Sequence, residues 1–221
     1  MGLNAFDGAG DLPRAELLCQ LRDDVRWHDG RPFDARDVRF SWSLWKNPSV
    51  DCDARRYMFD KLVDCEVLGE HEVRFRFNAP YFMAPSTFDE SFTLLPAHRF
   101  DLADPANPDH DPDAGAERQA QYVNEHPGNQ EWIGLGPYRL VAADERLITA
   151  RRFDDYFDPA AGGWVDEIRW RILPVGETAL QALLAGEIDF YDRLSAEEYS
   201  GERTASDGFR SRFYTGYYFT P

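Results

Sequence analysis

The side chains best suited to chemistry gather near the start of the chain, in the segment RWHDGRPFDARDV (residues 26–38). It holds His28, Asp29, Asp34 and Asp37. A histidine beside carboxylates can act as a general base or ligate a metal ion. His28 and Asp29 are adjacent, however, so their side chains point to opposite sides of an extended chain. We also find no nucleophile nearby that would complete a triad. The pattern therefore disfavours catalysis.

The same segment fits a turn followed by the start of a helix. The Asp-Gly pair at residues 29–30 is a turn signal. Asp34 is a favourable N-cap residue, and Asp37, three positions later, takes the place of a capping-box acid. Phe33 before the cap and Val38 inside the helix have the spacing of a hydrophobic staple. We therefore predict a structural role for these acidic residues.

Three further aspartates, Asp109, Asp111 and Asp113, have the spacing of a calcium loop. The glycine that such a loop needs comes one position late, at Gly115, and its twelfth position holds Ala120 instead of glutamate. A calcium loop is therefore disfavoured, and we predict a solvated acidic loop.

The remaining motifs favour no metal, cofactor or catalytic site. The Gly-rich segment at residues 134–137 precedes a predicted strand, whereas phosphate binding needs a helix there. His71, His98, His110 and His126 share no ligand spacing. Acidic residues are plentiful, but nothing selects one pair for glycoside hydrolysis. We predict that the protein is not an enzyme and binds neither a metal nor a cofactor.

The composition is that of a folded, acidic protein. The 221 residues are 43% hydrophobic and 14% aromatic, which is enough to bury a core. A net charge of −16 would repel phosphate backbones, so we exclude nucleic acid as a partner. The chain has no apolar run of about 18 residues. Its first residues lack the basic start and apolar core of a signal peptide, and we expect none in this chain.

The three cysteines, Cys19, Cys52 and Cys65, form no CxxC pair and no zinc spacing. A disulfide between Cys52 and Cys65 would require an oxidising compartment. Buried free thiols are the alternative that we favour. The sequence leaves both open.

Periodicity predicts the elements that position these residues. Loose alternation over residues 16–28 predicts a hairpin with an acidic turn. After the cap, Val38, Trp42 and Trp45 form one helical stripe, which residues 47–48 (Asn-Pro) end.

The next elements are a short helix and a hairpin. We expect a helix at residues 54–63 with Tyr57, Met58 and Leu62 inward. Apolar residues then alternate with arginines in a hairpin over residues 65–77, which gives one buried and one solvated face.

A second group of elements follows a polar segment. Residues 101–131 are rich in Asp, Pro, Asn and Gly, so we predict a long acidic surface excursion, with a short helix at 115–123. It marks the expected boundary between domains 1–132 and 133–221. Beyond it we predict an antiparallel strand pair at residues 136–144 and 146–153, a third strand at 167–174 and a helix at 176–186. A strand from Ile188, a short helix at 195–198 and an aromatic strand at 209–219 should follow.

Several segments resemble the family 5 extracellular solute-binding proteins, the dipeptide-, oligopeptide- and nickel-binding components of ABC importers. The segment LRDDVRWHDGRPFDARDVRFSW (residues 21–42) resembles the family's signature string. HEVRFRFNAPYF, LLPAH, GLGPYRL and LLAGEIDF resemble later family segments in the same order, with Leu135 where the family has threonine. The likeness runs from Leu17 to Phe219. The matched signature positions are Leu21, Arg22, Val25, Trp27, Asp29, Gly30, Pro32, Phe33, Ala35, Asp37, Val38, Phe40, Ser41 and Trp42.

The resemblance implies an α+β (mixed α/β) fold of the type II periplasmic-binding-protein kind. It implies that residues 1–132 are a small inserted α+β domain and that residues 133–221 are part of the first lobe. On this view the chain is a partial fragment of a longer receptor, with the opposite lobe missing.

The resemblance also implies a function without bond making or breaking. In the family, a ligand bound between two lobes favours their closure, and the closed form delivers the ligand to a permease. It implies a periplasmic or extracytoplasmic monomer whose partners are a small peptide or similar solute and an ABC permease of the inner membrane. The near-lobe ligand residues would be Tyr191, Asp192, Arg193, Tyr217 and Tyr218.

Two alternatives from other classes stay open. One is a protein-interaction module that reuses the inserted domain, which a large exposed apolar patch would favour. The other is an acid-pair hydrolase, which a pocket with two perturbed carboxylates would favour. Ligand identity is also open, since dipeptide, oligopeptide, sugar and metal-chelate binders share these motifs.

Overall fold

The computed structural model describes residues 3–6, 14–80, 84–88, 92–173 and 178–191. The chain forms two compact units, Met1–Trp170 and Arg171–Pro221. The domain boundary that we expect after residue 132 lies inside the first unit, and it stays a prediction.

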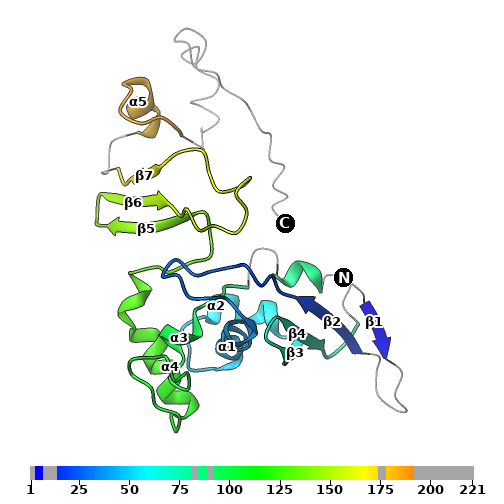
Figure 1. The fold of residues 1–221 in the computed structure, drawn as a ribbon. Helices are drawn as coiled ribbons and strands as arrows, with labels where there is room; N and C mark the ends of the chain where they lie inside the picture. The colour runs from blue at the N-terminus through cyan, green and yellow to red at the C-terminus, as the bar shows by residue number, and fades with distance from the viewer. Residues whose placement is uncertain (1–2, 7–13, 81–83, 89–91, 174–177, 192–221) are drawn as a thin grey trace. The chain divides into compact units, whose positions relative to one another are not determined.

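The first unit contains an antiparallel four-stranded sheet with the strand order β1-β2-β4-β3 (Figure 1). In β4, Val73, Phe75 and Phe77 are buried, as their alternation with arginines predicts. Phe75 is the cross-strand partner of both Leu17 and Cys65, so three strands contribute to one apolar face. The strands are β1 (Leu3–Phe6), β2 (Arg14–Gln20), β3 (Leu62–Gly69) and β4 (Glu72–Phe77).

The opposite face of this sheet carries a network of ion pairs. The Arg76 guanidinium donates to Glu16 at 3.0 Å, Asp64 at 2.7 Å and Glu66 at 2.5 Å. Arg74 contacts Glu16 and Glu66 as well. These five residues are half-buried and none is fully buried, so the predicted solvated face is confirmed. The three acids and two arginines come from β2, β3 and β4, so the network links these three strands.

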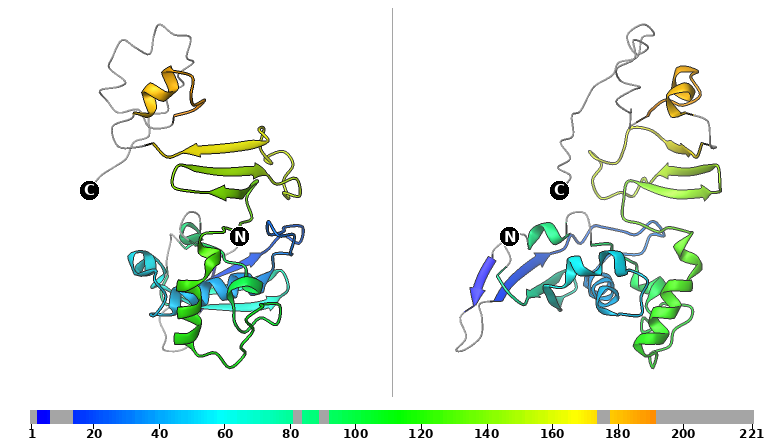
Figure 2. Two further views of the ribbon diagram at one scale, coloured as in Figure 1. Left: turned by 90° about the vertical axis from the view of Figure 1, so that its left-hand side faces the viewer. Right: turned by 180° about the vertical axis from the view of Figure 1, so that it is seen from behind.

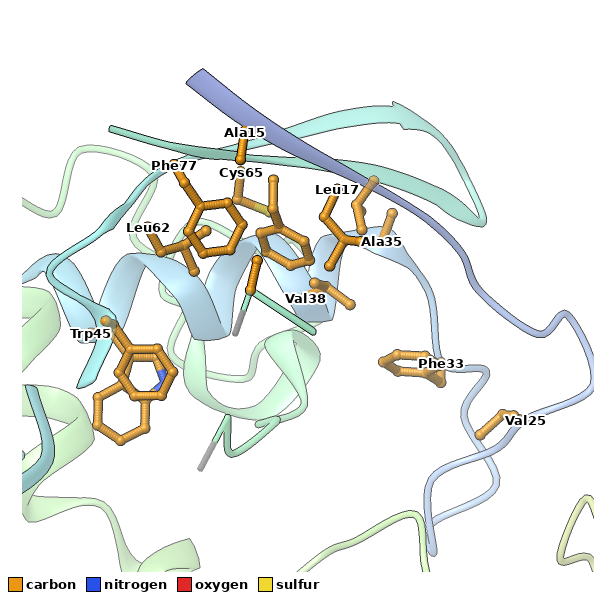
Figure 3. Packing of buried hydrophobic residues seen from close by; sticks show 14 of the residues in the cluster. Ala15, Leu17, Val25, Phe33, Ala35, Val38, Trp45, Leu62, Cys65 and Phe77 are labelled. Atoms are coloured by element: carbon orange, nitrogen blue, oxygen red, sulfur yellow. The ribbon is translucent and has the colours of Figure 1, made fainter. Parts of the chain in front are cut away.

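Helix α1 (Ala35–Lys46) packs on the apolar face, as Figures 1 and 2 show. Figure 3 shows Val38 of this helix beneath Leu17, Cys65 and Phe77 of the sheet. Trp45 is also buried in this first core, whereas Trp42 is half-buried against it. The helix ends at Lys46, where the expected Asn-Pro stop begins, so its predicted position and stripe are confirmed.

The other side of α1 is apolar too. Phe40 and Leu44 pack in a second core with α3 (Ala97–Phe100) and α4 (Ala116–Glu125). The helix expected at residues 115–123 is therefore present. The region expected to be a surface excursion is packed more closely than its composition suggested. It buries Leu102, Ala120 and Val123, and the Asn107 side chain donates to the backbone carbonyls of Arg99 and Asp101. The hydrogen bonds of the buried Asn107 side chain thus hold this region in place, as a packed apolar side chain would elsewhere.

Two local predictions were wrong. Strand β2 pairs with β1 and β4, so residues 16–28 do not form a hairpin with each other. In the short helix, α2 (Asp53–Arg56) passes into the 3₁₀ turn η1 (Tyr57–Phe59). Tyr57 and Met58 are exposed there, and Phe59 is buried instead. Leu62 is buried as predicted. A 3₁₀ turn has three residues per turn, so it shifts the inward position.

A three-stranded sheet follows in the order β5-β6-β7. Its strands are β5 (Tyr138–Ala143), β6 (Leu147–Arg152) and β7 (Glu167–Arg171), with β5 and β6 antiparallel as predicted. The Asp144 carboxylate accepts the backbone N–H groups of Arg146 and Leu147 and closes the β5–β6 turn. These bonds hold the pKa of Asp144 below its ordinary value.

The second unit contains α5 (Ala179–Leu184), with Thr178 as its N-cap. Gly186 ends the predicted helix with a φ of 72°, a conformation that glycine adopts without strain. Residues 188–190 do not form the expected strand. The helix and the aromatic strand expected at 195–198 and 209–219 lie outside the described residues.

The remaining elements and the cysteines complete the description. η2 (Pro85–Phe88) and η3 (Pro127–Asn129) are 3₁₀ turns. All three cysteines carry free thiols, and only Cys65 is fully buried, where burial raises its pKa to about 12. No described helix combines the length and apolar character that crossing a bilayer requires.

Candidate functional site

The structure reaches only one of the five residues expected to bind ligand. Tyr191 is half-buried at the end of the described part of the second unit. Asp192, Arg193, Tyr217 and Tyr218 lie outside the described residues. This set therefore stays a prediction.

The acidic segment that first suggested chemistry is built around Asp37, which is 4% exposed. Its Oδ2 atom accepts the indole N–H of Trp27 at 3.0 Å and the backbone N–H of Asp34 at 3.1 Å. Its Oδ1 atom accepts the backbone N–H of Ala97 at 2.7 Å. Burial raises the pKa of Asp37, and the three N–H donors oppose that shift. One carboxylate thus joins the start of α1, the segment before it and the start of α3.

The predicted capping box is confirmed around this carboxylate. Asp34 caps α1 by accepting the backbone N–H of Arg36 at 2.8 Å, and it also pairs with the Arg36 guanidinium. Gly30 turns the chain with a φ of 86° and donates its N–H to the Trp27 carbonyl. Phe33 and Val38 are both buried in the first core, as the staple requires. The segment is a turn and a helix start, as its spacing predicted.

His28 connects this turn to the segment before β5. Its Nε2 atom lies 2.9 Å from the Gly136 carbonyl, and its Nδ1 atom accepts the Gly134 N–H at 3.1 Å. This pair of bonds requires a neutral ring protonated at Nε2. The ring also packs edge-on against Phe153, at 5.1 Å between centroids. Burial and the charge of Arg139 lower the pKa of His28, which favours the neutral form.

Asp29 makes a second connection. Its Oδ2 atom lies 2.7 Å from Nε2 of His98, which belongs to α3, while its Oδ1 atom accepts the Arg31 N–H. His28 and Asp29 therefore serve different neighbours. Among the described residues, no group of three or more His, Cys, Asp or Glu side chains is arranged to hold a metal ion.

The role of His28 predicts a pH dependence of stability. The folded pKa lies below the unfolded value of 6.5, so in that interval the unfolded chain holds more protons. The free energy of unfolding should therefore fall as the pH is lowered from about 6.5 to the folded pKa. Urea unfolding between pH 7.5 and pH 5.5 measures this loss, which should be smaller in His28→Gln.

Glutamine is the matched control because it offers a donor and an acceptor without titrating in this range. The pH dependence of the free energy of unfolding of His28→Gln is subtracted from that of the parent chain. This subtraction removes the contributions of His126 and Asp101, whose pKa values are also shifted by burial. Identical profiles for the two proteins would contradict the assignment.

A pocket of about 480 Å³ opens beside this junction. Strand β5 forms one wall of it. His28, Asp29 and the segment before β5 form the other. Arg139 and Trp132 are its exposed cationic and aromatic side chains. The hydrophobic periodicity of the sequence could not predict this pocket, because its walls come from segments about a hundred residues apart. The complete lining is His28, Asp29, Arg99, Gln130, Glu131, Trp132, Ile133 and residues 139–143.

Comparison with known proteins relates almost the whole chain to one family. The profile described as "Bacterial extracellular solute-binding proteins, family 5 Middle" matches residues 15–219. The oligopeptide-binding protein AppA of Bacillus subtilis is 24% identical over 204 residues, which cover 90% of this chain and 34% of that protein. The peptidoglycan-binding protein YepA of Agrobacterium fabrum is 28% identical over 203 residues, 86% of this chain and 29% of that protein.

Solved structures agree on the fold. The crystal structure of NikZ from Campylobacter jejuni in complex with Ni(L-His) superposes with a TM-score of 0.62 at 23% identity, over 85% of this chain and 32% of that one. Such structural neighbours are type II periplasmic binding proteins, so the predicted mixed α/β fold is confirmed. The chain spans about a third of the length of the relatives it matches.

Proposed function

Because the chain belongs to the bacterial extracellular solute-binding proteins of family 5, we propose that it forms part of the substrate-binding component of an ABC importer for peptides. The profile match over residues 15–219 is the observation that carries this proposal. The named relatives are binding proteins rather than enzymes, which supports a function without covalent chemistry.

The choice of peptides rests on the printed names of relatives. AppA is named for oligopeptide binding and YepA for peptidoglycan binding, and NikZ was solved with a nickel–histidine complex. Ligands with peptide bonds or amino-acid groups are common to all three. A main-chain mode of recognition would suit this range, because it reads the peptide backbone rather than one side chain.

The proposed mechanism is closure around the ligand. A ligand that contacts two lobes binds the closed form more tightly and so shifts the population toward it. In our proposal Tyr191, Asp192, Arg193, Tyr217 and Tyr218 form one wall of that cleft. The protein would act as a monomer outside the cytoplasmic membrane and deliver its solute to a permease.

A thermal-shift screen tests the function with di- to hexapeptides. It compares this chain with the product of its complete reading frame. A ligand at about 100 times its Kd should raise the free energy of unfolding of a competent receptor by about 2.7 kcal/mol. We expect stabilisation of a receptor with both lobes and much less of a chain with one cleft wall.

Two outcomes bear on different parts of the proposal. If no peptide stabilises the complete product, the peptide assignment is wrong. If both proteins are stabilised equally by the same peptide, the claim that this chain holds only one wall of the site is wrong. Asp192→Asn and Tyr217→Phe in the complete product then test the named wall residues.

A further inference from the structure

The pocket beside β5 follows a strand edge that has no neighbour in the part of the chain the structure describes. In the order β5-β6-β7, β5 pairs with β6 on one side only. Residues 139–143 of β5 line the pocket. An unpaired edge offers backbone N–H and C=O groups to an added extended segment. The register shifts between Leu140 and Ala142, so the regular edge lies before that bulge, around Arg139.

Arg139 is the positively charged residue of β5 that lines the pocket. It is exposed, and no described residue pairs with it. Its cross-strand partner in the β5–β6 register is Arg151, and like charges placed opposite each other disfavour pairing. Arg151 has its own acid, since its Nε atom donates to Glu167 at 3.0 Å. Arg139 is therefore the guanidinium of this strand pair that an incoming carboxylate would neutralise.

The charges on the opposite wall are already engaged. Arg99 pairs with Glu131 at 2.7 Å, and Asp29 bonds to His98. The Arg139 charge is thus not matched by a free acid of the pocket, although Asp29 adds negative charge to the lining. This distribution suits a ligand that brings one carboxylate to Arg139.

Trp132 supplies a fixed apolar surface. Its indole N–H donates to the Asn129 carbonyl at 2.7 Å, and Asn129 in turn donates to the Val123 carbonyl at 2.8 Å. The side chain is nevertheless 58% exposed. An aromatic ring held in one orientation with its face open contributes contact area at little entropic cost.

We propose that this pocket binds a short extended peptide with a free C-terminal carboxylate. The peptide lies along the edge of β5, its carboxylate pairs with Arg139, and an apolar side chain packs on Trp132. The pocket volume of about 480 Å³ lies within the usual size of small-ligand sites, about 300–1,000 Å³. None of its lining residues is among the five proposed for the interlobe cleft, so it is a second peptide site.

Fluorescence anisotropy on this chain tests the proposal with three probes. They are N-terminally fluorescein-labelled Val-Leu-Val with a free carboxylate, its C-terminal amide, and the free acid methylated on the leucine nitrogen. We expect the free acid to bind and the amide to bind about tenfold more weakly, because a charge-assisted pair is lost. The N-methyl peptide should also bind more weakly, because it lacks a donor for the strand edge.

Variants locate the site. Arg139→Gln should weaken the free acid about tenfold and leave the amide unchanged. Arg169→Gln removes the same charge from β7, does not line the pocket, and should change binding less than twofold. Since Arg139 is exposed and opposes Arg151, Arg139→Gln should melt no lower than the parent chain.

Several results would overturn the inference. They are no binding of the free acid at millimolar concentration, equal binding of acid and amide, or an Arg139→Gln protein that binds like the parent. Weakening by Tyr191→Ala but not by Arg139→Gln would place the peptide at the proposed cleft wall instead. If the N-methyl peptide binds as tightly as the unmethylated free acid, the claim that the peptide pairs with the edge of β5 is wrong.

Discussion

Replacing Asp37 with alanine should lower the free energy of unfolding by about 3–5 kcal/mol, since each buried donor left unsatisfied costs roughly 1–3 kcal/mol. Three N–H groups lose their acceptor, those of Trp27, Asp34 and Ala97. They belong to three segments, so the loss should unfold the first unit cooperatively rather than fray one helix. Urea unfolding followed by tryptophan fluorescence and by circular dichroism measures it.

Two further substitutions separate the causes. Asp34→Ala removes the helix cap but keeps the Asp37 carboxylate, and it should cost about 1 kcal/mol. Asp37→Asn keeps one acceptor oxygen and removes a buried charge, so it should lose less stability than alanine. If Asp37→Ala costs no more than Asp34→Ala, Asp37 is only a cap residue and does not join the three segments.

The second large effect is expected at Phe59, whose side chain has no exposed surface. Phe59→Ala should lower the free energy of unfolding by about 3–5 kcal/mol, which is usual for a buried phenylalanine. Its ring contacts Trp45 at 4.4 Å and Phe92 at 5.8 Å between centroids. The cavity would therefore open between α1 and the segment that follows β4. The urea midpoint of the variant, compared with the parent, measures the loss.

Tyr57→Ala is the matched control, two residues away in the same turn. Tyr57 is 70% exposed, so its removal should change the free energy of unfolding by less than about 0.5 kcal/mol. A large loss at Tyr57 with a small loss at Phe59 would restore the original prediction that Tyr57 points inward.

These two experiments examine features that differ in how far the sequence could predict them. Asp34 and Asp37 were predictable because a capping box acts between residues three apart, within one turn of one helix. The buried alternation in β4 was predictable for a similar reason, since period-two burial is written into consecutive residues. The inward position of Phe59 was not predictable. A change from α to 3₁₀ geometry changes the number of residues per turn, and so changes which side chains point inward.

Pairing between distant segments was beyond local reasoning. The hairpin expected over residues 16–28 was wrong because β2 takes its partners from β1 and from β4, whose residue Arg76 opposes Glu16. The polar segment 101–131 was expected at the surface. It packs well because Asn107 and Gln119 use backbone carbonyls as partners, and such bonds leave no hydropathy pattern.

The sequence alone determined the family and the local elements. Fourteen matched positions of the signature segment and the order of later motifs identified the family, and the profile match confirmed that resemblance. Only the tertiary structure decided what the signature residues touch. His28 bonds to Gly134 and Gly136 across more than a hundred positions, and Asp37 reaches Ala97 across 60. Hydrogen bonds of that kind depend on which segments fold together, whereas caps and periodicities depend on neighbours along the chain.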